Sequence, residues 1–123
     1  MKNITEQFME KMQLFFPVTK QMYRKSVEKY GMVLESVVIE DIFMPEIIKL
    51  LHSDEYLDLL EKVFRYIEET VNDDNNGHLI DILSVTVFEI LGNDRELLKR
   101  AKQYMGPKSL MLQIEADKEL RRT

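Results

Sequence analysis

The segment LIDILSVTVFEIL, from Leu79 to Leu91, is the most apolar part of the chain and constrains the fold more than any other segment. It is too short to span a membrane, which takes ~20 residues in a helix. It also carries Asp81 and Glu89, and a carboxylate inside lipid is costly. We therefore expect this segment to be buried inside a folded domain and not in a bilayer.

The order of polar and apolar residues in this region predicts a helix. On a helical wheel, the polar side chains fall in one narrow sector and the apolar ones fill the other side. The residues of the polar sector are His78, Asp81, Ser84, Glu89 and Gly92. In a strand, both acids would instead lie on the same face as the apolar residues between them. A strand would therefore not separate the polar side chains from the apolar ones. We therefore predict that residues 78–92 form the central helix of an all-α domain.

The composition limits the classes of protein to which the chain can belong. Its 123 residues are the length of one domain. It has only 4 glycines and 3 prolines, too few for a β-sandwich, which needs a turn every ~8–12 residues. It has no cysteine, so disulfides, thiolate catalysis and cysteine-bound metal centres are excluded.

The charge balance indicates the kind of partner that the chain would bind. There are 22 acidic residues against 17 basic ones, and the formal net charge is −5. Because proteins bind double-stranded nucleic acid mainly by neutralising its phosphates, we do not expect a nucleic-acid partner. An acidic surface favours a basic protein partner. No basic stretch followed by an apolar one is seen near the N-terminus, so we expect no signal peptide, no membrane association and a cytoplasmic location.

Capping and helix-breaking residues divide the chain into six or seven predicted helices joined by short loops. Residues 32–44 are rich in Val and Ile, which suits a strand. Their apolar positions have helical spacing, however, and no partner strand is apparent, so we predict a helix there. Pro45 is expected to open a separate short helix through Leu51.

These helices predict a single all-α domain over residues 1–123, built as a bundle or as a helical-repeat-like array. Within it, residues 1–44 would form N-terminal helices and residues 45–123 antiparallel helix pairs. For the helix at residues 18–30, the predicted inward side chains are Met22, Val27 and Tyr30. For the helix at residues 109–121, they are Leu110, Ile114 and Leu120.

No catalytic motif is present. The sequence lacks HExxH, GxSxG, GxGxxG and P-loop patterns. A zinc site would need both histidines, His52 and His78, together with carboxylates. The carboxylates of residues 55–71 alternate with Lys62 and Arg65, which indicates a solvated, salt-bridged face. We therefore predict a protein that is not an enzyme and uses no cofactor and no metal.

Six residues are candidates for binding a partner. They are Glu35, Glu40, Asp41, Phe43, Glu46 and Glu89. The first five surround Pro45, where acids would steer a basic partner and apolar side chains would anchor it. Glu89 lies near the C-terminal end of the central helix, where the helix dipole disfavours an acid. It is either an exposed edge residue or a partly buried acid that holds a neighbouring loop or a partner's cation. The alternative for the cluster near Pro45 is an ordinary solvated edge over the core.

Two short motifs carry a resemblance to a known family. Ser84–Leu91 is similar to a helix end of the form vsfhEnL, and Gly106–Leu110 is similar to a GP-type helix start that follows it. Tyr56–Glu69 also looks alike, so the resemblance covers roughly the C-terminal two-thirds of the chain. In these parts the chain resembles small, all-helical bacterial immunity proteins of polymorphic toxin systems.

The resemblance implies a helical, non-catalytic protein that binds one toxin and blocks it, and Glu89 matches the family's acid by position. An acidic surface would suit this function, because it could cover the nucleic-acid site of a basic nuclease. Two other hypotheses remain. One is a small helical enzyme or metal-binding protein that uses acids near the histidines, and the other is a helical adaptor or homodimer.

Overall fold

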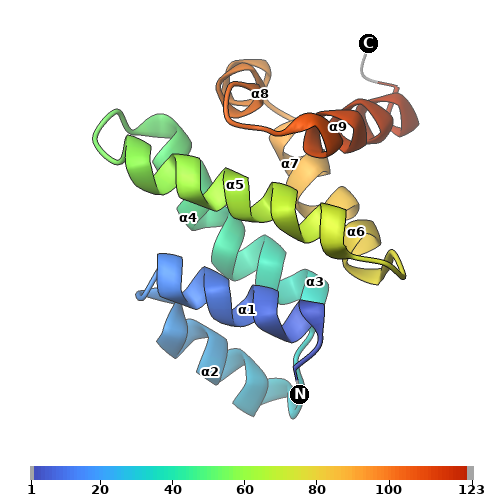
Figure 1. The fold of residues 1–123 in the computed structure, drawn as a ribbon. Helices are drawn as coiled ribbons and strands as arrows, with labels where there is room; N and C mark the ends of the chain where they lie inside the picture. The colour runs from blue at the N-terminus through green and yellow to red at the C-terminus, as the bar shows by residue number, and fades with distance from the viewer. Residues whose placement is uncertain (1, 122–123) are drawn as a thin grey trace.

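A computed structural model of the chain describes residues 2–121, and within that range every regular element is a helix (Figure 1). The elements are α1 (Ile4–Phe15), α2 (Thr19–Tyr30), α3 (Glu35–Val38), the π-helical η1 (Ile39–Phe43), α4 (Met44–His52), α5 (Leu57–Asp73), α6 (His78–Leu83), the π-helical η2 (Ser84–Phe88), α7 (Glu89–Leu91), α8 (Arg95–Lys102) and α9 (Pro107–Glu119). The elements α3, η1 and α4 follow one another without a break, and so do α6, η2 and α7. Residues 2–121 therefore form seven helices, which confirms the predicted all-α domain.

The helices form two layers (Figure 1). In the front layer α5 lies between α1 and α9 and contacts both. Behind it, the helix α3–η1–α4 lies beside the helix α6–η2–α7, with η1 against η2. At one end α2 packs on η1, and at the other α8 packs on α4 and α7. These contacts cover the two rear helices in front and at both ends.

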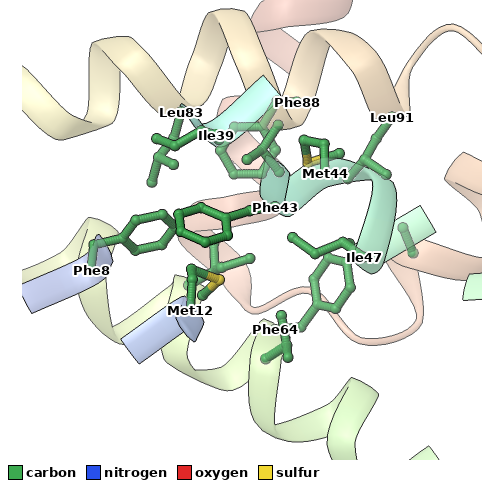
Figure 2. Close-up of a cluster of buried hydrophobic side chains, with 14 of the residues drawn as sticks. Phe8, Met12, Ile39, Phe43, Met44, Ile47, Phe64, Leu83, Phe88 and Leu91 are labelled. Carbon is green, nitrogen blue, oxygen red and sulfur yellow. The ribbon is translucent and has the colours of Figure 1, made fainter. Parts of the chain in front are cut away.

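Large apolar side chains fill the space between the layers. Figure 2 shows Phe8 and Met12 of α1, Phe64 of α5, and Phe43 and Phe88 of the rear helices gathered around one core. Each of these side chains is at most 1% exposed. Burying one such side chain contributes roughly 1.5–3 kcal/mol, so this cluster is the main source of stability for the fold.

The first rear helix passes through Pro45, where the sequence predicted a new helix. It runs from Glu35 to His52, so the predicted helix start at residue 32 and the predicted separate helix from Pro45 are both wrong. The N–H of Met44 donates to the carbonyl of Ile39, five residues earlier, which makes the preceding turn wider than an α-turn. A proline ring clashes with the carbonyl four residues before it in a regular α-helix, and we attribute the uninterrupted helix to this wide turn.

The second rear helix covers residues 78–91 and confirms the predicted core helix, with three fully buried leucines on its inner side. It widens at η2 as its neighbour does at η1. The hydroxyl of Ser84 donates to the carbonyl of Ile80 at 2.8 Å, and that of Thr86 donates to the carbonyl of Ile82 at 2.7 Å. Both hydroxyls therefore satisfy the helix backbone. No helix within residues 2–121 is long and apolar enough to cross a membrane.

The first turn of α9 is capped by a side chain from α5. The Glu68 carboxylate accepts hydrogen bonds from the backbone N–H groups of Ser109 at 2.9 Å and Lys108 at 3.1 Å. The Asn72 amide donates to the same carboxylate at 2.8 Å. Gly106 precedes the helix, and a Cβ there would lie 2.4 Å from the Glu68 side chain. Glu68 was predicted to lie on a solvated face, but it joins two front-layer helices instead.

The inward side chains predicted for α2 are wrong in two of three cases. Met22 and Tyr30 are exposed, and only Val27 is half-buried. The side of α2 that meets the fold carries Thr19, which is fully buried, and Tyr23, which packs against the core. The buried side of α2 is therefore more polar than its apolar spacing suggested.

The face predicted for α9 is wrong in two of three cases. Leu110 is half-buried against the core, but Ile114 and Leu120 are exposed, whereas Ser109 and Gln113 are fully buried. The side-chain amide of Gln113 donates to the backbone carbonyl of Phe88 at 2.8 Å. Polar residues can occupy a buried face when the neighbouring helices supply hydrogen-bond partners, and hydrophobic spacing does not show this.

Candidate protein-binding face and cavity

The rear side of the two rear helices carries a group of exposed residues that we call the outer face. It consists of Val37, Glu40 and Asp41 from the first rear helix and Asp81 and Val85 from the second. Val37 is 36% exposed and Val85 is 51% exposed. Each of these residues lies on its own helix opposite the side chains that the helix buries in the core, and the two helices contact each other where η1 packs on η2. The outer face is an acidic surface with two exposed apolar side chains.

Both π-helical segments contribute to this surface. Glu40 and Asp41 lie within η1, and Val85 lies within η2. The two segments pack against each other, so the irregular backbone of both rear helices is concentrated at one place. Single π-turns inside α-helices are uncommon and are frequently found at functional sites. This irregular backbone therefore marks the outer face as a candidate site.

Phe43, predicted as an apolar partner contact, lies in the core. Its side chain is 0% exposed and faces the front layer, as Figure 2 shows. Its neighbours Val38 and Ile42 are also buried, which leaves Val37 as the exposed apolar residue among them. A surface anchor at Phe43 is therefore excluded, because the helix turns this position inward.

The predicted acids have different surroundings. Glu40 and Asp41 are exposed on the outer face, and Glu89 is half-buried at the start of α7. The side chain of Glu46 is only 18% exposed, and its carboxylate lies 3.1 Å from the ammonium of Lys49. Glu40 and Asp41, which are neighbours in the sequence, are therefore both exposed on η1. The structure places Glu46 against its own helix.

Glu35 lies apart from the outer face, at the edge of a cavity. Both of its carboxylate oxygens are 3.3 Å from Nε2 of His78, at the start of α6. The cavity measures about 640 Å³ and opens between α1, α2 and the starts of α3 and α6. Glu6 and Glu10 of α1 and Tyr23 of α2 also line it. No local motif could have revealed this cavity, because its residues come from four helices that meet only in the folded chain.

The structure keeps the two histidines apart. His52 ends α4, just before α5 begins, and His78 begins α6, just after α5 ends. At 1.5 Å per residue, α5 alone separates them by ~25 Å, so they cannot share a metal ion. Within residues 2–121, no group of three or more histidines and carboxylates is arranged to hold a metal.

Comparison with known proteins assigns a family. A family model described as "Domain of unknown function (DUF7674)" matches residues 9–121. The match spans nearly all of the helical domain, from within α1 to just beyond α9. No curated protein and no solved structure gives a significant match to the chain.

Proposed function

We propose that this chain, which belongs to the DUF7674 family, is a non-catalytic protein-binding domain whose outer face docks a basic partner. The observation that carries the proposal is the position of Glu40, Asp41 and Asp81. All three are exposed, and they come from two helices that pack against each other at η1 and η2, which supports a shared acidic surface. Clustered carboxylates of this kind raise the rate at which a basic protein associates and select against acidic ones.

The apolar residues of the outer face can supply the binding affinity that its charges alone do not. Exposed charge pairs contribute little affinity, because water and salt screen them. Val37 and Val85 are exposed beside the acids and can be buried by a partner, which adds a hydrophobic contribution. A basic partner with a small apolar patch among its lysines and arginines fits this surface best.

Within this class, we propose an immunity-type inhibitor that neutralises a bacterial toxin. The resemblance of Ser84–Leu91 and Gly106–Leu110 to immunity proteins supports this choice, and so does the acidic outer face. A toxin that cleaves nucleic acid needs a basic surface for its substrate, and an acidic protein can cover that surface. Inhibition would then require only tight binding, with no chemistry by this chain.

The test is capture of a partner by the tagged chain, co-expressed with the proteins encoded beside it, followed by mass spectrometry. The variant is Glu40→Lys with Asp41→Lys. The control is Glu115→Lys with Glu119→Lys, which makes the same charge change at exposed positions of α9. We expect one basic protein in stoichiometric amount, retained by the control and lost by the outer-face variant.

Two results would overturn the proposal. One is recovery of the chain alone from all samples, which would favour a homodimer. The other is a partner lost equally from both charge variants, which would show that net charge and not the outer face governs binding. An inhibitor role requires in addition that the captured protein be toxic when it is expressed without this chain.

A further inference from the structure

The cavity beside α1 has the size and the mixed lining of a small-molecule site. Its volume of about 640 Å³ lies within the roughly 300–1,000 Å³ typical of ligand pockets. Met9 and Val33 supply apolar lining, and Tyr23 adds an aromatic ring from α2. Met9 is almost fully buried, and Val33 and Tyr23 are half-buried. A ligand with an aliphatic part could therefore be shielded from water there.

The charged groups of this cavity favour a cation. Three carboxylates line it, those of Glu6, Glu10 and Glu35, against one lysine, Lys2, and the imidazole of His78. Burial raises the pKa of the Tyr23 hydroxyl, and the carboxylates of Glu10 and Glu6 raise it further. The same negative field that opposes ionisation of this phenol would attract a positively charged ligand.

Two polar groups in the cavity have no partner within residues 2–121. Thr5 is only 9% exposed and lines the cavity, yet its hydroxyl makes no hydrogen bond to the described part of the chain. The hydroxyl of Tyr23 likewise makes none there. A side chain as buried as Thr5 usually has a hydrogen-bond partner, so its hydroxyl is suited to accept from a ligand's N–H group, and the half-buried Tyr23 hydroxyl can do the same.

One ammonium group already pairs with a carboxylate of the cavity lining. Lys2 and Glu10 both line the cavity, and their side chains form an exposed ion pair. A ligand ammonium on Glu10 would take the place of this side chain and could extend further inward. Glu6 would then be available for a second ammonium group, and a third could take the place of the His78 imidazole on Glu35.

We infer that this cavity binds a small aliphatic polyamine. Its ammonium groups would meet Glu6, Glu10 and Glu35, and its methylene chain would cover Met9 and Val33. The Tyr23 ring can add a cation–π contact. The site is separate from the outer face, so this inference does not depend on the proposed inhibitor role.

The test is a titration of the full chain with spermidine, in which binding is measured by calorimetry and by NMR. The uncharged 1,8-octanediol serves as the control ligand. We expect saturable binding of spermidine, with the largest NMR shifts at Thr5, Met9 and Tyr23, and no binding of the diol. Glu6→Gln with Glu10→Gln should weaken binding at least tenfold. The matched pair Glu61→Gln with Glu69→Gln, on α5, should change it less than twofold.

A second pair of variants predicts a change of the opposite sign. Lys2→Met removes the competing ammonium from Glu10 and should tighten spermidine binding several-fold. Lys62→Met, the same charge change on α5, should have no such effect. Equal responses of the cavity and control variants would overturn the inference, because they would reveal non-specific attraction to an acidic protein. Absence of saturable binding, or NMR shifts away from the cavity, would overturn it as well.

Discussion

The carboxylate of Glu68 lies 2.9 Å from the backbone N–H of Ser109, and this contact joins α5 to the first turn of α9. The first N–H groups of a helix lack partners within the helix, and a side chain from the preceding residue usually supplies one. Here that preceding residue is Gly106, which has no side chain. The cap therefore comes from a different helix and fixes how the two pack.

A double-mutant cycle can test this cap. Glu68→Ala should lower the free energy of unfolding by about 1 kcal/mol, the usual cost of a lost cap. Gly106→Ala should have a similar cost, because its Cβ would displace the Glu68 side chain. In the Glu68→Ala background the same glycine substitution should cost nothing, or stabilise by up to about 1 kcal/mol, because the backbone there is open to any residue. Urea denaturation measures all four proteins, and additive effects would disprove the coupling.

The Glu68 cap should also depend on pH. Burial would raise the pKa of this carboxyl, but the hydrogen bonds from Ser109, Asn72 and Lys108 outweigh it, so the pKa lies below its usual value of 4.5. A lowered pKa in the folded state stabilises the fold above the unfolded value, and this contribution is lost as the pH falls through the folded pKa. Glu68→Gln should therefore be less stable than the parent at pH 7, and the gap should narrow as the pH falls below 4.5. Thermal melts across this range check it, and a gap that is independent of pH would contradict it.

The burial of Phe43 leads to a third prediction. Phe43→Ala should lower stability by about 3–5 kcal/mol, the usual cost of removing a core phenylalanine. Val37→Ala, six positions earlier on the same rear helix, should change stability by less than about 0.5 kcal/mol, because its side chain is exposed. Chemical denaturation monitored by circular dichroism compares them. A Phe43→Ala protein as stable as Val37→Ala would contradict the inward position of this ring.

Hydrophobic spacing was sufficient to predict the fold class and the central helix. The run from Leu79 to Leu91 is apolar on most sides of a helix, so its burial could be predicted without knowing its neighbours. The passage of a helix through Pro45 could not be predicted. It depends on a wide turn at η1, a segment that contacts η2, far along the chain.

The candidate sites could be predicted only in part. Glu40 and Asp41 are adjacent in sequence, so their clustering needed no knowledge of the fold. The orientation of Phe43 did, because the π-turn changes the side of the helix on which each residue falls. No feature of the sequence indicated a role for Tyr23. The inward face of its helix was predicted from apolar spacing, and the side that is in fact buried is more polar.

The most direct test of the outer face is hydrogen–deuterium exchange of the chain with and without its captured basic partner. We predict that binding slows exchange in residues 36–42 and 81–86, the backbone of the outer face, and leaves α9 unchanged. Slowed exchange confined to α9 or to the exposed side of α2, with residues 36–42 and 81–86 unaffected, would contradict the central claim.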